Sequence, residues 1–276
     1  MKLKMKNTEF GDFAEDLEKF LNAKTIDEAV SILSDRIKKR FNKFFILDEN
    51  ITIYRCRIIN DLNEIKTIQN ITYPDPKKIE LGHARLNQKD EALFYGASHN
   101  MTSFTETVPD VFFHENVPVL ACISEWTNQT KIPTFQLGIV GMDRLRVTKT
   151  GQPLPDNHEQ LIFEELVHQL FKFPDVDYYL QTTALRKYLQ LEADKLKNPW
   201  TADDVGFVYP TVKTPLLYNA PYNLAVPPAV ADTKLVLKDI KIWEMERPLA
   251  GDTDSVVMKP VKELSEIVGG EITWKN

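Results

Sequence analysis

Arginines, tyrosines, hydroxyl side chains and a single carboxylate recur at short spacing along the chain. Arg55 stands in a strand-like run, where cations are unusual, and Glu106 lies in a short predicted helix that we expect Thr102 to cap. The full set of candidate residues comprises Tyr54, Arg55, Arg85, Asn87, Tyr95, Ser98, Glu106, Tyr209 and Thr211. The set contains no thiol and no group of metal ligands, so we expect no metal site.

These side chains suit a ligand that is anionic and aromatic and also carries a cation. An arginine guanidinium binds a pyrophosphate through two parallel hydrogen bonds, although an arginine in a strand is commonly one half of a surface ion pair. A tyrosine ring packs flat against a heterocycle and favours a cationic ring such as nicotinamide. A lone carboxylate can stabilise the oxocarbenium-like charge that develops when an N-glycosidic bond opens. Because nicotinamide leaves NAD as a neutral molecule, that reaction needs no general acid.

Common nucleotide-binding and catalytic motifs are absent from the sequence. Neither GxxxxGK(S/T) nor GxGxxG occurs, and the chain has only 10 glycines, which argues against a P-loop kinase or a Rossmann dehydrogenase. The 5 histidines form no HExxH motif, and no GxSxG elbow is present, which argues against a zinc site and a standard α/β-hydrolase. A nucleophile built from Cys122 and a histidine stays open, although small buried cysteines are common core residues.

Short strand-like runs separated by turn residues begin at residue 51. The strongest strand candidates are Ile51–Ile59, Ala92–Ala97, Val117–Ile123, Phe135–Val140, Val205–Tyr209 and Lys234–Trp243. Two longer stretches with helical spacing, about 157–172 and 176–197, interrupt them. Because the strands do not alternate regularly with helices, the pattern predicts an α+β fold rather than a doubly wound parallel sheet.

The two ends of the chain differ from this central part, which we expect to form one domain over residues 51–246. Residues 1–50 predict a helical leader of two helices, the second beginning at a capping box of Thr25 and Glu28. The leader either packs into the core or serves as a docking surface for a partner. Its apolar stripe comprises Ile26, Ala29, Val30, Leu33, Ile37 and Phe41. Residues 247–276 predict a turn-rich tail.

The overall composition is that of an ordinary globular protein. Of the 276 residues 43% are hydrophobic and 27% are charged, and the formal net charge of -6 lacks the basic field that nucleic-acid binding favours. No apolar stretch approaches the roughly 20 residues that span a bilayer, and no signal peptide is visible. With only 2 cysteines, the chain predicts no disulfide framework. We therefore expect a cytoplasmic protein that contacts neither nucleic acid nor membrane.

In their order along the chain, the candidate residues resemble the RES domain, a family named for its arginine, glutamate and serine. The family pattern is an early strand arginine, a Gly-x-Arg-aromatic-Asn segment, a strand with a tyrosine, a helix ending in glutamate and a Tyr-Pro-Ser stretch. The resemblance covers roughly residues 54–240. The matching positions are Arg55, Arg85 and Asn87 with the glycine one place early at Gly82, Tyr95, Glu106, and Tyr209-Pro210-Thr211.

The resemblance implies an α+β fold like that of diphtheria-type ADP-ribosyltransferases, with a mixed or antiparallel split sheet and flanking helices. It implies a toxin-like enzyme with NAD as its substrate and no cofactor, which hydrolyses or phosphorolyses the nicotinamide–ribose bond. It also implies an antitoxin protein as a partner, and the leader could serve homo-oligomerisation. Catalysis would then fall to Glu106, Arg85 and Thr211. Substrate binding would fall to Arg55, Tyr54, Tyr95, Asn87, Ser98 and Tyr209.

Two residues depart from the family pattern. Thr211 replaces the serine, which keeps a hydroxyl and adds a methyl group that stiffens χ1, and Leu86 replaces the aromatic residue beside Arg85. Either change could shift the substrate or weaken the site. Two other functions therefore stay open beside cleavage of NAD with water or phosphate as acceptor: an ADP-ribosyltransferase that modifies a protein, and an NAD-binding module without turnover.

Overall fold

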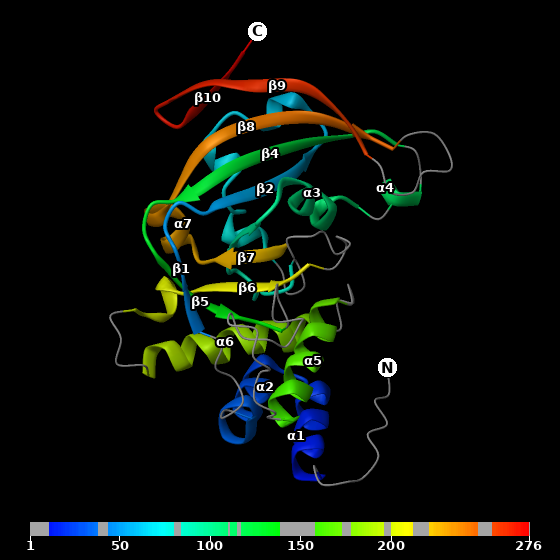
Figure 1. The fold of residues 1–276 in the computed structure, drawn as a ribbon, viewed down its shortest axis with the longest axis vertical. Helices are drawn as coiled ribbons and strands as arrows, with labels where there is room; N and C mark the ends of the chain where they lie inside the picture. The colour runs from blue at the N-terminus through cyan, green and yellow to red at the C-terminus, as the bar shows by residue number, and fades with distance from the viewer. Residues whose placement is uncertain are drawn as a thin grey trace, which may run out of the picture.

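A ten-stranded mixed sheet runs through the molecule, with helices packed against it (Figure 1). The strand order is β1-β5-β6-β7-β3-β2-β4-β8-β9-β10, and the described pairs are antiparallel except for β5 and β6, which are parallel. The predicted α+β class, with a mixed sheet and flanking helices, is confirmed. The computed structural model describes residues 11–37, 44–79, 84–109, 111–114, 117–138, 158–172, 178–195, 200–211, 221–247 and 256–275.

The elements have the following bounds. The strands are β1 (Phe44–Leu47), β2 (Thr52–Ile59), β3 (Phe94–Ala97), β4 (Val119–Asn128), β5 (Ile132–Gln136), β6 (Gly206–Pro210), β7 (Tyr222–Val226), β8 (Leu235–Glu246), β9 (Val257–Val268) and β10 (Glu271–Trp274). The helices are α1 (Gly11–Asn22), α2 (Ile26–Ile32), α3 (Asn100–Thr107), α4 (Val111–His114), α5 (His158–Lys172), α6 (Tyr179–Lys195) and α7 (Pro228–Lys234).

The sheet consists of two halves that meet at a single residue pair. Strands β1, β5, β6, β7 and β3 form one half, here the β3 half, and strands β2, β4, β8, β9 and β10 form the other, here the β2 half. Strand β2 pairs with β4 from Thr52 to Ile59, but it pairs with β3 only through Tyr54 and Ala97. The two halves lie one above the other in Figure 1. The sheet therefore splits beyond this junction.

Gly96 allows the two halves to meet. A Cβ atom at this position would collide with the side chain of Ile53 and would lie 3.2 Å from the carbonyl oxygen of Tyr54. Any larger residue would therefore push β3 away from β2 at the junction, because the Cβ atom would point into the Ile53 side chain.

We expect Gly96→Ala to lower the free energy of unfolding by about 1–3 kcal/mol, because the added methyl overpacks the junction. Thermal and urea unfolding of the variant would measure the loss. If the collision with Ile53 is the cause, Gly96→Ala combined with Ile53→Ala will lose less stability than the two single variants together. Strictly additive losses would contradict this explanation.

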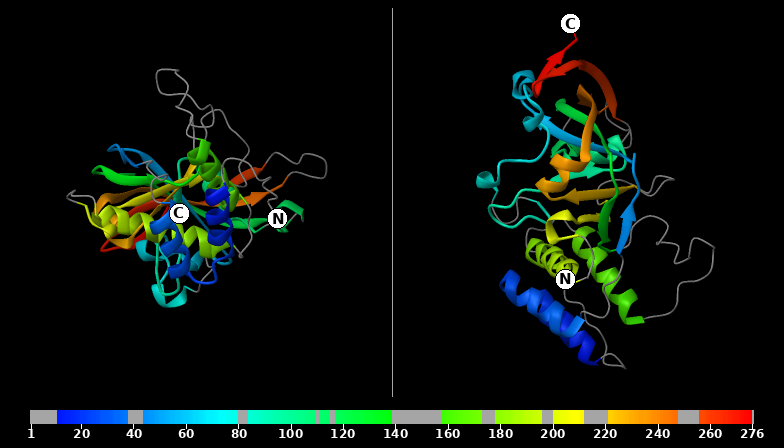
Figure 2. Two further views of the ribbon diagram at one scale, coloured as in Figure 1. Left: turned by 90° about the horizontal axis from the view of Figure 1, so that it is seen from below. Right: turned by 90° about the vertical axis from the view of Figure 1, so that its left-hand side faces the viewer.

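The N-terminal helices α1 and α2 pack into the core. Phe13, Leu17 and Phe20 of α1 are buried in one apolar cluster with residues of α5, α6 and the β3 half. The right-hand view of Figure 2 shows α1 and α2 beside α5 and α6 at one end of the molecule. The predicted core role of the stripe is confirmed for Ala29, Leu33 and Ile37, while Phe41 lies outside the described residues.

Helix α2 begins at the predicted cap, with one difference in detail. The hydroxyl of Thr25 accepts a hydrogen bond from the backbone nitrogen of Glu28 at 3.1 Å, as predicted. The Glu28 carboxylate, however, accepts from the backbone nitrogen of Lys24 at 2.8 Å, one residue before the cap. The first bond satisfies an amide that the first helical turn leaves without a partner, and the second ties the residue before the cap to the helix.

Both terminal segments contain strands that the sequence patterns did not predict. Strand β1 lies inside the segment that we expected to be helical, and it pairs with β5. The expected turn-rich tail instead forms β9 and β10 over the described residues 256–275, with β9 paired to β8. Pro260 and the charged residues of β9 concealed this strand. The structure accommodates the proline beside a register shift, where a missing backbone donor is tolerated.

The other predicted elements lie close to their expected positions, with two further corrections, while α4, β7 and α7 were not predicted. Strand β5 spans Ile132–Gln136 and so begins before the predicted Phe135–Val140 run, whose end lies outside the described residues. Thr102 does not cap α3: the N-cap is His99, and Thr102 is completely buried inside the helix.

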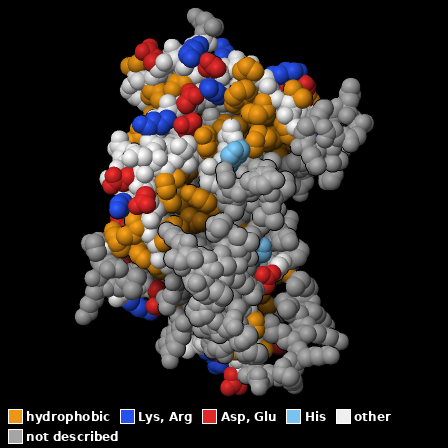
Figure 3. Space-filling view, viewed as in Figure 1, with side chains coloured by type: hydrophobic (Ala, Val, Ile, Leu, Met, Phe, Trp, Pro, Cys, Tyr) orange, Lys and Arg blue, Asp and Glu red, His pale blue; other side chains and the backbone are white. Residues whose placement is uncertain are grey.

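A separate apolar cluster fixes α3 on the β2 half of the sheet. Phe104, Val108 and Phe112 are buried there with residues of β2 and β4, and the rings of Phe104 and Phe112 lie 5.3 Å apart in a T-shaped arrangement. Hydrophobic side chains gather over β4 and β8 beside α3 on the face shown in Figure 3. With this face of α3 buried, its opposite face turns toward the junction of the two halves.

Candidate functional site

A cavity of about 360 Å³ lies where the sheet splits. Both halves of the sheet contribute to its wall, together with α3, the start of α6 and the segment before β3. Its volume falls in the range of small-molecule pockets, roughly 300–1,000 Å³. The lining residues are Arg55, Cys56, Ala84, Arg85, Tyr95, Gly96, Ala97, Ser103, Glu106, Thr107, Tyr179, Tyr209 and Asn223.

The cavity brings together five of the nine residues that the sequence singled out: Arg55, Arg85, Tyr95, Glu106 and Tyr209. They come from β2, the segment before β3, β3 itself, α3 and β6. The charged groups among the described lining residues are two guanidinium groups and one carboxylate, which gives a formal charge of +1. The two guanidinium groups attract an anion, and the nearby Glu106 carboxylate can act on a different part of the same ligand.

Arg55 is a half-buried cation whose polar atoms are only partly satisfied. Its Nη1 atom donates a hydrogen bond to the backbone oxygen of Tyr95 at 2.8 Å, and its guanidinium carbon lies 5.4 Å from the centre of the Phe94 ring. Its Nε atom is buried and has no hydrogen-bond partner among the described residues. Burial lowers the pKa of Arg55 to about 10, so the group stays charged at neutral pH.

Arg85 lies in the segment 84–91, which we call the Arg85 segment. The Nη1 atom of Arg85 is buried without a hydrogen-bond partner among the described residues. The backbone oxygen of Arg85, in contrast, accepts a hydrogen bond from the Thr182 hydroxyl of α6. The main chain of this residue is therefore fixed while part of its guanidinium group has an unused donor. Gly82, which the motif placed before it, lies outside the described residues.

Tyr95 connects the two arginines. Its backbone oxygen accepts from Arg55, and its hydroxyl accepts from the backbone nitrogen of Leu86 at 3.1 Å and donates to Asn87 Oδ1 at 2.8 Å. Burial raises the pKa of Tyr95, and also that of Tyr209, well above the ordinary value, so both phenols are neutral at physiological pH. Tyr95 therefore holds the Arg85 segment through its hydroxyl.

Helix α3 presents Glu106 together with two hydroxyls. Ser103, Glu106 and Thr107 have the spacing i, i+3, i+4, which places them on one face of the helix, and all three line the cavity. Glu106 was among the residues predicted from the sequence, whereas neither hydroxyl was, although the helical spacing could have indicated both. Tyr179 and Asn223 also line the cavity and were not predicted, because no local sequence pattern distinguishes them.

Four predicted site residues lie outside the cavity wall. Tyr54 lines a second cavity of about 140 Å³, because neighbouring side chains of a strand point to opposite faces. Asn87 is buried and binds Tyr95 and the backbone oxygen of Glu91. The Ser98 hydroxyl accepts from the backbone nitrogen of Tyr222 at 3.0 Å, which joins β3 to β7. Thr211 directly follows β6 and is half-buried.

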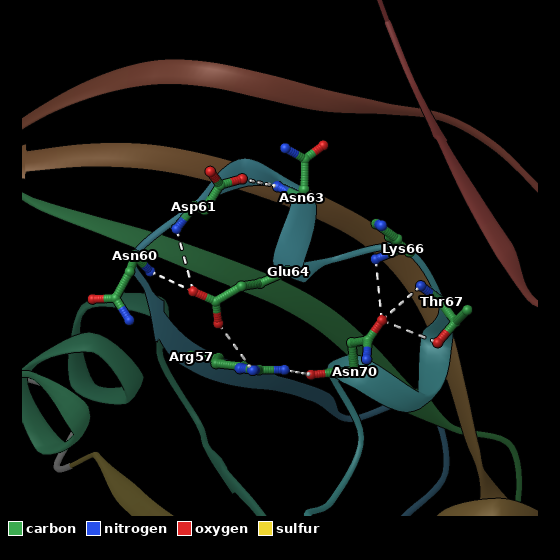
Figure 4. Close-up of polar contacts among 8 residues, drawn as sticks. All are labelled: Arg57, Asn60, Asp61, Asn63, Glu64, Lys66, Thr67 and Asn70. Atoms are coloured by element: carbon green, nitrogen blue, oxygen red, sulfur yellow. Dashed lines mark hydrogen bonds and ion pairs between the residues drawn. The ribbon is translucent and has the colours of Figure 1, made fainter.

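Arg57, the second cation of the β2 run, has a structural role. Its guanidinium group donates to the backbone oxygen of Asn70 at 2.7 Å and pairs with Glu64 at 3.1 Å (Figure 4). The other carboxylate oxygen of Glu64 accepts from the backbone nitrogens of Asn60 and Asp61. This network holds the connection after β2 against the sheet, away from the cavity.

The two departures from the family pattern lie away from the cavity wall. Leu86 is fully buried in the apolar cluster beneath the Arg85 segment, and Thr211 is not among the lining residues. We therefore expect Thr211→Ser to change the rate of nicotinamide release from NAD by less than about twofold, because the substitution removes a methyl group outside the site. Steady-state assays of both proteins would measure the ratio. A gain of tenfold or more would show that the serine belongs to the site.

Among the described residues, the side chains of histidine, cysteine, aspartate and glutamate form no group of three that could hold a metal ion. Cys56 and Cys122 are buried and form no disulfide bond. Burial raises the pKa of both thiols, that of Cys122 to about 12. A thiolate nucleophile at either position is therefore disfavoured. No helix in the described part of the chain is both long and apolar enough to cross a membrane.

Comparison with protein-family models, with curated proteins and with solved structures finds no significant match to this chain. The site therefore has to be interpreted from its own residues and geometry.

Proposed function

We propose that the protein consumes NAD by cleaving the bond between nicotinamide and ribose. The observation that carries the proposal is the convergence of Arg55, Arg85 and Glu106, from three different elements, on one cavity at the split of the sheet. The ordered resemblance to the RES domain supports the same reaction and an ADP-ribosyltransferase-like fold. The split between β2 and β3 is consistent with such a fold.

In this proposal the two arginines hold the pyrophosphate of NAD. Arg85 offers a buried Nη1 donor and Arg55 a buried Nε donor, neither of which has a partner among the described residues. A pyrophosphate would satisfy both donors and compensate the two positive charges. The cavity is near the lower end of the usual range for ligand pockets, so we expect the adenosine end of NAD to extend beyond it.

Glu106 stabilises the reacting ribose. As the N-glycosidic bond breaks, its electron pair moves to the nicotinamide nitrogen, and positive charge develops on the ribose ring. A carboxylate fixed beside that ring lowers the barrier by electrostatic attraction. The acceptor, water or phosphate, then forms the new bond to the ribose C1 atom. Ser103 and Thr107 supply the neighbouring hydroxyls that we had assigned to Thr211.

The direct test is incubation of the purified protein with NAD, with and without phosphate, followed by chromatography of the products. Release of nicotinamide with free ADP-ribose would identify a hydrolase, and a phosphate-dependent product would identify a phosphorylase. Labelled NAD added to a cell lysate would detect the alternative, an ADP-ribosyltransferase, as labelled protein. A folded protein that NAD stabilises thermally without any product would instead be a binding module.

A further inference from the structure

Helix α6 carries an unusual buried polar face. Thr182, Thr183 and Arg186 are each no more than 1% exposed, and Arg186 is among the largest fully buried side chains of the described residues. Buried polar groups cost folding free energy unless they are hydrogen-bonded, and a helix packed in a core is normally apolar on that side. This polar face therefore requires an explanation beyond core packing.

All three side chains bind the Arg85 segment. Thr182 donates its hydroxyl to the backbone oxygen of Arg85, and Thr183 donates to the backbone oxygen of Asn87 at 3.1 Å. Arg186 forms a two-pronged ion pair with Glu91, at the end of the segment, with 3.1 Å between Nη1 and Oε1. The polar face of α6 thus contacts the segment at its start, middle and end.

A chain of hydrogen bonds leads from the ion pair back to Arg85. The backbone oxygen of Glu91 accepts from Asn87 Nδ2 at 2.5 Å, and Asn87 Oδ1 accepts from the Tyr95 hydroxyl. That hydroxyl accepts from the backbone nitrogen of Leu86, the residue next to Arg85. The position of Arg85 in the cavity wall is therefore coupled, through three linked contacts, to the position of Glu91.

We propose that Arg186 is a positioning residue, which holds Glu91 and so fixes the Arg85 segment for an anionic ligand. A segment that is ordered before binding loses less conformational entropy when the ligand arrives, which raises affinity. The Glu91 side chain is 35% exposed, and ion pairs contribute little net stability whether they are exposed or buried, so stability alone does not account for this pair. The inference rests on the proposed function in so far as the anion is the pyrophosphate of NAD.

The test replaces both partners, as Arg186→Met with Glu91→Gln, so that no unpaired charge is left buried. Calorimetric titration of the full chain with inorganic pyrophosphate is expected to show about tenfold weaker binding. The KM for NAD should rise by a similar factor while kcat stays within about twofold, because Glu106 lies on a different element. Arg186→Lys, which keeps a cation opposite Glu91, should restore part of the affinity.

Leu189→Ala is the matched control. Leu189 is buried on the same helix within the apolar cluster, and its side chain takes no part in the hydrogen bonds and ion pair that hold the Arg85 segment. Its loss should lower the melting temperature while leaving pyrophosphate affinity and KM unchanged. An equal loss of affinity in this control would attribute the effect to helix stability and overturn the inference.

Two further results would overturn the inference: unchanged pyrophosphate affinity in the double variant, or no pyrophosphate binding by the unaltered chain. Failure of the proposed function has a different signature. In that case the unaltered chain would bind pyrophosphate but release no nicotinamide, and the titration would still decide the role of Arg186.

Discussion

Replacement of Glu106 by glutamine is expected to reduce nicotinamide release from NAD by about 10²–10³-fold, the usual cost of losing one preorganised electrostatic stabiliser. The carboxamide keeps the shape of the side chain on α3 and removes its negative charge. Because the charge acts on the developing oxocarbenium rather than on bound NAD, the loss should fall on kcat with little change in KM. Steady-state kinetics of nicotinamide release would measure both constants.

Glu125→Gln provides the matched control. Glu125 lies on β4, is half-buried like Glu106 and lines the second cavity instead of the first. Its replacement makes the same chemical change on a strand against which α3 packs, so turnover should stay within about twofold of the unaltered protein. Equal losses in the two variants would indicate a general electrostatic effect, and full activity of Glu106→Gln would remove this residue from the mechanism.

Local patterns predicted the helices and most central strands because burial in this fold follows the period of each element. The apolar stripe of α2 and the spacing of α1 are buried as expected, since a helix packed on one side must bury one face. Strand β9 was missed for the opposite reason. It lies near the edge of the sheet, is only partly buried and carries charged residues, so its sequence lacks the apolar alternation of a half-buried strand.

The sequence pointed to the charged residues of the cavity wall but not to all of the residues that line it. Arg55, Arg85 and Glu106 stand out because each has a residue type that its local pattern does not require. Which face of an element turns to the cavity is decided by packing elsewhere, as for α3, whose apolar residues fix its orientation. Asn87 shows the converse: it was selected from a motif, but its side chain binds Tyr95 and the backbone oxygen of Glu91 and does not line the cavity.

The second large effect is expected at Arg55, whose buried charge has no described carboxylate partner. Arg55→Met should weaken binding of inorganic pyrophosphate roughly tenfold to a hundredfold, the range for a lost hydrogen bond to a charged group. The methionine can fill the space of the side-chain stem and removes a dehydrated cation, which offsets the lost bond to the Tyr95 backbone oxygen. Calorimetric titration and thermal unfolding would measure affinity and stability separately.

The lowered pKa of Arg55 gives this prediction a pH signature. Since the pKa in the folded protein is about 10, against 12.5 without burial, the charged form costs folding free energy at every pH below about 10. That cost is relieved as the pH rises from about 10 toward 12.5, so this group's contribution to stability improves over that window. Pyrophosphate binding has the opposite dependence, because it needs the charged form, and its affinity should begin to fall as the pH approaches 10.

Arg57→Met separates the site charge from the general charge of strand β2. Arg57 lies two residues from Arg55, but its guanidinium group is bound by Glu64 and the backbone oxygen of Asn70 (Figure 4). Its loss should lower stability without changing pyrophosphate affinity at neutral pH, and the decline of affinity toward pH 10 should persist. In Arg55→Met that part of the pH dependence should disappear. If both variants lose affinity equally, the anion responds to the net charge of the strand, and the geometry of the split sheet does not select Arg55 as its ligand.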